Sequence, residues 1–311
     1  MRVVVLLGGE SEEREVSLAS GCQVADALRH AGHDVVAVDP VGSALTRAEE
    51  AKILTQGVGS LPPREIANTG ASSSRTPSDT SGASPCTALS CREEIVSADV
   101  VFPALHGGMG EDGTLQALLD LAGVAYAGSG VLGCGLAMDK DVTKRLLRDA
   151  GVPTPDWLMN PTADEAVERL GLPIIAKPVA GGSSVRLYLL KTRGALEERI
   201  QLEAAVASGS DASDMMYEAF VAGRELTVGI LGNEALPVGE IVSQHELFDY
   251  ECKYQTDMAQ EIFPAEIPDE LAHALQQRAL EVHHLLRLRD FSRVDFMVDE
   301  WGEAWCLEAN A

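Results

Sequence analysis

SRVDFMV at residues 292–298 and AWCLEAN at residues 304–310 decide the fold of this chain. Both stretches are rich in β-branched and aromatic residues, and Gly302 lies in the segment that joins them. We therefore predict a β-hairpin, with Trp301 and Gly302 at the centre of a tight turn. Side chains alternate along a strand, so every second residue of each arm faces the same side of the hairpin.

Four polar side chains of this hairpin are predicted to meet on one face. With the turn centred on residues 301–302, Asp295 lies opposite Glu308 and Arg293 lies opposite Asn310. Like charges directly opposite one another are destabilising unless a positive group lies between them. Mg²⁺ meets that need, because it takes one or two carboxylates and leaves its other positions to water and phosphate. The alternative is an exposed hairpin with solvated charges, and these residues alone do not decide between the two.

Composition limits the classes to which the chain can belong. With 311 residues, of which 46% are hydrophobic, it can bury a large core in two or three domains. Its net charge of −24 argues against nucleic acid or an anionic membrane as a partner, although local lysines can still bind a phosphate. The six cysteines have no metal-type spacing, which is typical of free thiols in the cytoplasm. No signal peptide and no membrane-spanning run are expected, so the predicted location is cytoplasmic.

The N-terminal part has the pattern of a parallel α/β sheet. An apolar run at residues 2–7 ends in Gly8-Gly9, and a helical pattern then extends to Gly32, where a second strand begins. The pattern G-x-G-x-x-G is absent, which disfavours dinucleotide binding. Glu15, an acid in the first helical turn, would face the mouth of the sheet. The simpler alternative is that Glu15 only interacts favourably with the helix dipole.

A glycine-rich loop follows a later strand of the same sheet. The strand at residues 100–105 ends in His106, and glycines recur through residues 107–113. Ligands of open α/β sheets bind at the carboxyl ends of the strands, so His106 is a candidate binding residue. By contrast, residues 57–92 are rich in serine, threonine and proline, and we predict a flexible insertion without catalytic content.

Two lysines and a glycine–serine loop predict a phosphate site in the middle of the chain. Lys140 precedes a predicted helix, and Lys177 ends the predicted strand at residues 173–178. The loop that follows contains Ser183 and Ser184, and its backbone N–H groups can close over phosphates. It is not a Walker A loop, because the spacing differs and no lysine follows the glycines. Either lysine alone could be a solvated surface residue, but a buried lysine needs an anionic partner.

Two further segments are candidate walls of a nucleotide site. The apolar segment at residues 215–221 is interrupted by Glu218 and can form one side of a base pocket. Glu225 begins the next strand, where it could reach ribose hydroxyls; the alternative is plain core with exposed acids. The aromatic loop at residues 248–265 is a predicted lid, because loops of this length are usually functional or disordered.

Short motifs follow one another along the chain. They are LLGG (6–9), EREVS (13–17), HGG (106–108), GEDG (110–113), MDK (138–140), KP (177–178), GSSV (182–185), DYECKY (249–254), RVD (293–295) and LEAN (307–310). Each motif alone is weak, but their order makes chance similarity very unlikely. In this order they resemble the ATP-grasp superfamily and, within it, the D-alanine–D-alanine ligase family.

The resemblance implies an α/β fold of three domains: a parallel α/β substrate domain (1–128), a central ATP-grasp domain (129–216) and a truncated C-terminal ATP-grasp domain (217–311). Two positions depart from the family pattern. Arg186 stands where the family usually has glycine, and Ala219 stands where a lysine is common beside the adenine.

The resemblance also implies a role for each candidate residue. ATP would be bound by Lys140, Lys177, Ser183, Ser184, Glu218, Phe220, Val221 and Glu225. Two Mg²⁺ or Mn²⁺ ions would be bound by Asp295, Glu308 and Asn310. The first D-alanine would be bound by Glu15, His106, Ser183 and Tyr254. Of the two remaining residues, Lys253 would meet the transferred phosphate and Arg293 the developing oxyanion.

The implied activity is the ATP-dependent joining of two D-alanines through an acyl phosphate, for peptidoglycan precursors. A cytoplasmic homodimer that binds neither nucleic acid nor membranes is expected. One alternative is a ligase that joins D-alanine to D-lactate or D-serine. Another is a nucleotide-binding fragment that makes no bond, because the family continues beyond Ala311 with a loop and helix that hold the second substrate.

Overall fold

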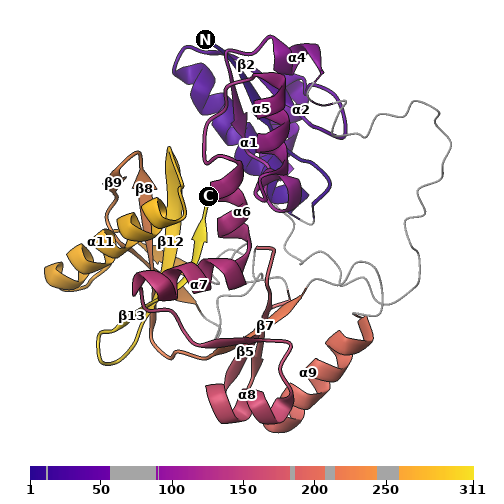
Figure 1. Cartoon of the computed structure of the whole chain (residues 1–311). Coiled ribbons are helices and arrows are strands. Elements are labelled where there is room, and N and C mark those ends of the chain that lie inside the picture. Colours follow the sequence, from indigo (N-terminus) through magenta and orange to yellow (C-terminus); the bar gives the residue numbers. More distant parts are fainter. Residues whose placement is uncertain (12, 57–88, 90, 183–185, 207–213, 244–258) are drawn as a thin grey trace. The chain divides into compact units, whose positions relative to one another are not determined.

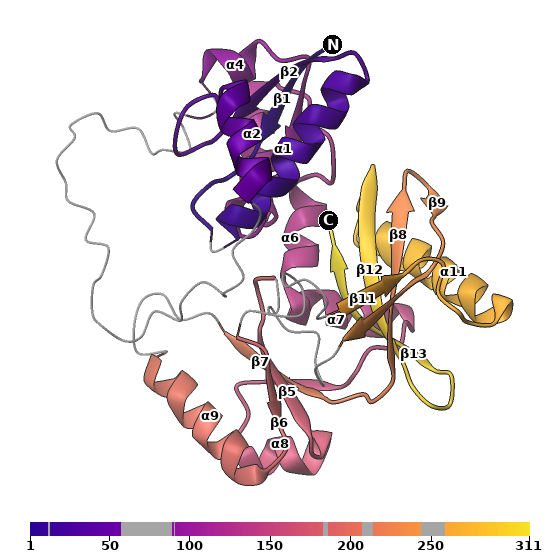
Figure 2. The same ribbon diagram turned by 180° about the vertical axis from the view of Figure 1, so that it is seen from behind.

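The computed structural model describes residues 1–11, 13–56, 89, 91–182, 186–206, 214–243 and 259–311 (Figure 1; Figure 2 shows the reverse view). The chain forms two compact units, Met1–Ala127 and Gly128–Ala311. Among the described helices, none combines the length and the apolar character that a membrane span requires.

The first unit is built on the predicted parallel sheet, with strand order β2-β1-β3. Its strands are β1 (Arg2–Leu6), β2 (Asp34–Val38) and β3 (Val100–Pro103). The central strand β1 is buried on both faces, as its continuous apolar run predicts: Val3 and Val5 belong to one core cluster, and Val4 and Leu6 to the other.

Helices cover both faces of this sheet. The helix α1 (Arg14–His30) contributes Cys22 and Ala25 to one core cluster. The helices α4 (Glu93–Val96) and α5 (Thr114–Ala122) contribute to the other. The glycine-rich segment between β3 and α5 forms a short 3₁₀ helix, η1 (Gly108–Gly110). This is the layered α/β arrangement that the sequence predicted for this part of the chain.

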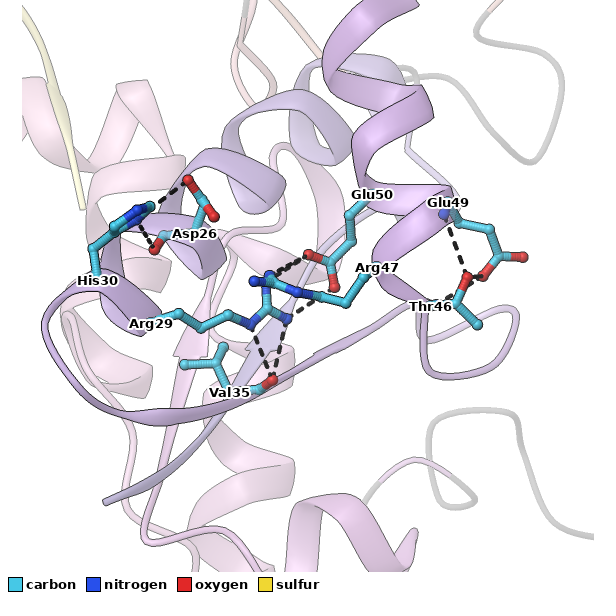
Figure 3. Close-up of polar contacts among 8 residues, drawn as sticks. All are labelled: Asp26, Arg29, His30, Val35, Thr46, Arg47, Glu49 and Glu50. Carbon is cyan, nitrogen blue, oxygen red and sulfur yellow. Dashed lines mark hydrogen bonds and ion pairs between the residues drawn. The ribbon is translucent and has the colours of Figure 1, made fainter.

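A buried ion pair joins α1 to α2 (Arg47–Gln56). The Arg29 guanidinium binds both carboxylate oxygens of Glu50, at 2.6 and 2.9 Å, and also donates to the Val35 carbonyl at 3.1 Å (Figure 3). Glu50 is only 4% exposed. A buried carboxylate stays ionised only when it is paired and hydrogen-bonded, so this contact fixes α2 against α1 and β2.

The predicted insertion at residues 57–92 extends too far. Leu89 is 3% exposed and belongs to the core on one face of the sheet. Arg92 donates to the carbonyls of Asp39 and Gly42, both at 3.2 Å. The packed chain therefore resumes by Leu89, in a stretch whose few apolar residues follow no helical or strand period. Residues 57–88 lie outside the described part of the chain.

The second unit contains two antiparallel sheets. The first has the order β4-β7-β5-β6. Its strands are β4 (Trp157–Met159), β7 (Met215–Ala219), β5 (Ile174–Pro178) and β6 (Tyr188–Leu190). The helices α8 (Ala163–Leu170) and α9 (Arg193–Val206) pack on it, with Ala166 and Leu196 fully buried.

The other sheet has the order β11-β10-β8-β12-β13, and β9 also pairs with β8. Its strands are β8 (Arg224–Leu231), β9 (Glu234–Ala235), β10 (Gly239–Ser243), β11 (Ala259–Ile262), β12 (Phe291–Val298) and β13 (Ala304–Asn310). Its core includes side chains from α6 (Val131–Met138), α7 (Lys140–Ala150) and α11 (Asp269–Leu285). The predicted boundary between residues 216 and 217 falls inside β7, and the division of this unit into two domains stays a prediction.

Candidate functional site

The predicted register of the hairpin formed by β12 and β13 is confirmed. Asp295 pairs with Glu308, and Arg293 pairs with Asn310. The predicted tight turn is wrong: the strands are joined by residues 299–303, inside which Asp299 accepts hydrogen bonds from backbone N–H groups. A bulge between Asp295 and Phe296 shifts the pairing by one residue. That shift offsets the longer turn and restores the expected pairing.

The Asp295 carboxylate is the centre of the polar face of this hairpin. Asp295 is 5% exposed and accepts hydrogen bonds from Arg293 Nε at 2.9 Å and from Asn310 Nδ2 at 3.0 Å. Thr227 Oγ1 on the neighbouring strand β8 donates at 2.7 Å, and sequence reasoning missed it. The charge of Asp295 raises the pKa of Arg293 above its usual value. The predicted cluster of Arg293, Asp295 and Asn310 is therefore present.

Lys140 lies against the same hairpin. It is the first residue of α7, which begins where the Asp139 side chain accepts the Val142 N–H at 2.9 Å. Its Nζ donates to the Gly181 carbonyl at 2.7 Å and lies 3.6 Å from Glu308 Oε2. The side chain is 10% exposed, so Lys140 is a buried lysine with the anionic partner that burial requires.

Lys177 and Glu218 form a second buried cluster together with Lys144. Lys177 Nζ donates to Glu218 Oε1 at 3.0 Å, and Lys144 Nζ donates to Glu218 Oε2. Burial by itself would raise the pKa of Glu218, but the two ammonium groups outweigh it and hold that pKa below its usual value. Burial opposes the charge of Lys177, yet Glu218 and then Glu308 raise its pKa. The site therefore holds an ionised carboxylate between two lysines.

Sequence reasoning missed Lys144. It lies one helical turn after Lys140, so both side chains are on the same face of α7. Its side chain is fully buried, and burial is the largest effect that lowers its pKa. The i, i+4 spacing from a lysine already singled out was the signal that could have identified it.

The two sheets of the second unit are tied together beside these lysines. Thr154 Oγ1 accepts from Lys144 Nζ at 2.7 Å and donates to the Cys306 carbonyl on β13 at 2.8 Å. The Cys306 N–H donates to the Pro153 carbonyl, also at 2.8 Å. Burial raises the pKa of the Cys306 thiol to about 12, so this cysteine is neutral and unsuited to nucleophilic chemistry.

The remaining residues expected around a nucleotide lie on β7, β8 and the link between them. Glu225 is partly exposed on β8, opposite Met297 of β12. Phe220 and Val221 are partly buried, and the Phe220 N–H already donates to the Pro173 carbonyl at 3.3 Å. A base that approached this segment would therefore meet the Phe220 carbonyl or the Val221 backbone.

The donor chemistry of the hairpin fits a hard divalent cation. The described residues include no group of three or more histidine, cysteine, aspartate or glutamate side chains suited to a metal. Asp295, Glu308 and Asn310 instead offer two carboxylates and one amide oxygen, which are the ligand types that Mg²⁺ and Mn²⁺ take. Asn310 turns its nitrogen toward Asp295, and rotation of its amide would present the oxygen instead.

In the first unit, Ser17 joins α1 to the carboxyl ends of two strands. Its hydroxyl accepts the Gly8 N–H at 2.8 Å and donates to the Ala104 carbonyl at 2.6 Å. His106 follows β3, with Nε2 at 3.0 Å from Ser20 Oγ and Nδ1 at 3.7 Å from Glu111 Oε1. His106 therefore lies at the strand ends, where the sequence predicted it, and α1 fixes its ring.

The structure brings Glu13, rather than the predicted Glu15, to this loop. Glu13 is 8% exposed, and its Oε2 lies 2.5 Å from where a Cβ on Gly107 would be. Glu15 lies in the first turn of α1 and is exposed. Helix α1 begins at Arg14, so Glu13 precedes the helix beside the strand ends, whereas Glu15 is directed outward. Four more predicted residues, Ser183, Ser184, Lys253 and Tyr254, lie outside the described part of the chain.

Comparisons with known proteins agree on one family. Residues 2–129 match the family model described as D-ala D-ala ligase N-terminus, and residues 146–311 match D-ala D-ala ligase C-terminus. A D-alanine–D-alanine ligase from Aquifex aeolicus is 36% identical over 312 residues, covering 100% of this chain and 89% of that protein.

Two solved structures share the fold over the whole chain. The D-alanine–D-alanine ligase from Bacillus anthracis, solved with ATP, is 27% identical with a TM-score of 0.70, covering 100% of this chain and 85% of that one. The VanG D-Ala:D-Ser ligase from Enterococcus faecalis is 27% identical with a TM-score of 0.73, covering 99% and 89%.

Proposed function

This chain belongs to the D-alanine–D-alanine ligase family, and on that premise we propose that it joins two D-alanine molecules in an ATP-dependent reaction. One observation carries the proposal: two buried lysines lie beside carboxylates in the second unit, Lys140 of α7 beside Glu308 of β13 and Lys177 of β5 beside Glu218 of β7. Such a set of charges suits a polyphosphate with a divalent cation. The relative from Bacillus anthracis was solved in complex with ATP.

The proposed reaction has two steps. A carboxylate oxygen of the first D-alanine attacks the γ-phosphorus of ATP, the bond to the β-γ bridging oxygen breaks, and ADP leaves. The amine of the second D-alanine then attacks the carbonyl carbon of the resulting acyl phosphate. Loss of a proton from nitrogen and departure of phosphate give D-alanyl-D-alanine. Most of the rate acceleration in such transfers comes from positioning and charge neutralisation.

The nucleotide is proposed to lie between the two sheets of the second unit. Lys140 and Lys177 bind its phosphates, together with the backbone and hydroxyls of Ser183 and Ser184. The ionised Glu218 accepts a hydrogen bond from the adenine amino group, the segment Phe220-Val221 meets the ring edge, and Glu225 meets the ribose. The burial of Lys140 and Lys177 supports these roles, and the raised pKa of Lys177 and lowered pKa of Glu218 keep that pair charged inside the protein.

Two Mg²⁺ or Mn²⁺ ions are proposed to be held by Asp295, Glu308 and Asn310. When bound, such ions neutralise phosphate charge and act as Lewis acids on the transferred group. Arg293 stays charged beside Asp295 and is available for the oxyanion that forms at the carbonyl. Lys253 is proposed to meet the transferred phosphate.

The first D-alanine is proposed to bind in the first unit. Its ammonium is received by Glu13 in the position expected of Glu15, because Glu13 is the buried acid at the ends of the strands. His106 lies near its carboxylate, and the contacts with Ser17 and Ser20 hold this loop in place. Ser183 and Tyr254 complete the substrate site in this proposal, with the aromatic loop as a lid that excludes water from the acyl phosphate.

Phosphate release from ATP tests the proposal. We expect release that depends on D-alanine and does not occur with L-alanine, together with a dipeptide identified by mass. D-Lactate and D-serine, each added with D-alanine, test the second substrate, since the VanG structure is that of a D-Ala:D-Ser ligase. ATP binding without D-alanine-dependent phosphate release would contradict the proposal and favour a nucleotide-binding protein that makes no bond.

A homodimer in the cytoplasm is the proposed context. The thiols of Cys22, Cys91 and Cys306 are free, as expected in a reducing compartment. Light scattering after size exclusion would give twice the chain mass of 33.0 kDa for a dimer, and a value near 33 kDa would contradict it.

A further inference from the structure

Lys144 has no role in the reaction proposed above, yet it shares the carboxylate of Glu218 with Lys177, and both Glu218 and Lys177 have a proposed role. Glu218 is 3% exposed and lies between Lys144 and Lys177, each of which donates to one of its two carboxylate oxygens. One buried carboxylate needs one cation to balance its charge, so the second lysine requires an explanation.

The surroundings of the two lysines differ. Lys144 is fully enclosed: its Nζ also donates to Thr154 Oγ1 at 2.7 Å and lies 5.2 Å from the centre of the Trp157 ring. Lys177 is 9% exposed, its Nζ donates to Glu218 Oε1 at 3.0 Å, and the charge of Glu308 also acts on it. Lys144 is therefore held by three contacts inside the protein, whereas Lys177 is less completely enclosed.

A phosphate that draws the Lys177 ammonium toward itself loosens the contact between Lys177 and Glu218. Without a second cation, this step would leave a buried carboxylate unpaired, which is strongly destabilising. Lys144 removes that cost, because its contact with Glu218 persists when Lys177 moves. Thr154, which also donates to the Cys306 carbonyl, keeps the Lys144 ammonium directed at the carboxylate.

We propose that Lys144 is a positioning residue which remains paired with Glu218 and so allows Lys177 to leave that carboxylate and bind the phosphates of the nucleotide. The inference rests on the proposed function, since it assumes that Lys177 binds phosphate. It adds a residue that touches neither the nucleotide nor the reacting atoms and acts only through Glu218.

The test compares the binding of ADP with that of adenosine, which lacks phosphates, by isothermal titration calorimetry. In K144M, the methionine fills the buried volume but leaves Lys177 as the only cation for Glu218. We expect ADP affinity to fall by about tenfold or more, the usual scale for a lost charged hydrogen bond, and adenosine affinity to change less than about threefold. The control K52M removes a lysine from an exposed position on α2 and should change neither affinity.

If Lys144 contributed only to packing, K144M would lower the affinities for ADP and adenosine equally. That result would overturn the inference, and so would an ADP affinity that K144M leaves unchanged. If the unmodified protein bound neither ligand, the proposed function itself would fail. The double variant K144M/E218Q covers the case in which K144M does not fold, because it removes one buried cation together with one buried carboxylate and so keeps the net charge of the cluster. The ratio of ADP affinity to adenosine affinity should be the same in this double variant as in E218Q alone. A lower ratio in the double variant than in E218Q would overturn the inference, because Lys144 would then affect ADP binding without acting through Glu218.

Discussion

Glu13 and Glu15 lie two residues apart, yet their surroundings differ. Glu13 is 8% exposed beside Gly107, and Glu15 is exposed. We expect E13Q to lower kcat/KM for D-alanine by at least about tenfold, because a hydrogen bond to a charged ammonium is lost. E15Q serves as the matched control and should change kcat/KM for D-alanine less than about threefold. Steady-state kinetics with varied D-alanine decide this, and a larger effect of E15Q would contradict the assignment of Glu13.

Glu308 provides the second prediction at the scale of single residues. E308Q replaces one of two carboxylates in the proposed metal site, and we expect Mn²⁺ binding to weaken by about tenfold or more, with loss of turnover. Electron paramagnetic resonance of free Mn²⁺ measures the binding directly. E300Q changes an exposed glutamate in the turn of the same hairpin and should bind Mn²⁺ normally. Normal Mn²⁺ binding by E308Q would contradict the metal assignment.

Individual residues were predictable from sequence where a motif or a strand period identified them. The alternation of side chains along β12 and β13 predicted that Arg293, Asp295, Glu308 and Asn310 share one face. The structure brings Arg293, Asp295 and Asn310 into direct contact. The residues that support them were missed. Thr227 reaches Asp295 from β8, and such a contact depends on which strands pair, which no local pattern reveals.

At the scale of elements, the hairpin shows how a correct register can follow from an incorrect turn. The turn at residues 299–303 is longer than predicted, and by itself it would set a different pairing. The bulge between Asp295 and Phe296 compensates, so Asp295 still pairs with Glu308. A bulge has no strong sequence signature, and only the strand period, not this compensation, could be predicted.

Arg186, which was expected to depart from the family pattern, has a backbone conformation that favours glycine. Its φ is 59°, in the left-handed region where glycine is usually found. The chain keeps an arginine there, and the side chain forms an ion pair with Glu203 on α9. An arginine therefore occupies a backbone conformation that glycine adopts with less strain.

The contact between α11 and β12 predicts a pH dependence of stability. His283 is 2% exposed, and its Nδ1 lies 2.7 Å from Ser292 Oγ. Burial, followed by the charge of His284, lowers the pKa of His283 below its value of 6.5 in the unfolded chain. Below about pH 6.5 the unfolded chain binds the additional proton, so stability present above that pH is lost as the pH falls.

Chemical denaturation of H283Q between pH 7.5 and about pH 5 measures this effect. We expect the free energy of unfolding of H283Q to fall less steeply with decreasing pH than that of the unmodified protein. H273Q changes an exposed histidine on the same helix and should keep the original slope. A slope for H283Q equal to that of H273Q would contradict the assignment of this pH dependence to His283.

At the scale of the whole molecule, the first D-alanine is proposed to contact Glu13 and His106 of the first unit, and the nucleotide is proposed to bind in the second unit. We expect ADP to slow amide hydrogen exchange in the second unit around Lys140, Lys177 and Glu218, because it orders the segments that contact it. D-Alanine should slow exchange at residues 8–17 and 104–110 of the first unit. Mass spectrometry of peptides measures both. Protection by ADP confined to the first unit would contradict the proposed site.

Much of the architecture could be predicted from the sequence, because strands buried on both faces read as continuous apolar runs. The parallel sheet of the first unit and the final hairpin are present as predicted. The insertion at residues 57–92 was predicted too long because the few apolar residues around Leu89 follow no helical or strand period. Lys144 was missed because the sequence of a helix does not distinguish a buried lysine from an exposed one. Its partner, Glu218 on β7, is distant in the sequence.

Carboxylate activation by the nucleotide is the central claim, and oxygen transfer tests it most directly. D-Alanine labelled with ¹⁸O in both carboxylate oxygens is incubated with the protein, ATP and Mg²⁺, and the released phosphate is analysed by mass spectrometry. Attack of the carboxylate on the γ-phosphorus predicts one ¹⁸O atom in each released phosphate, since the bridging oxygen of the acyl phosphate leaves with phosphorus. Phosphate without ¹⁸O would mean that water attacks ATP, and it would contradict the account.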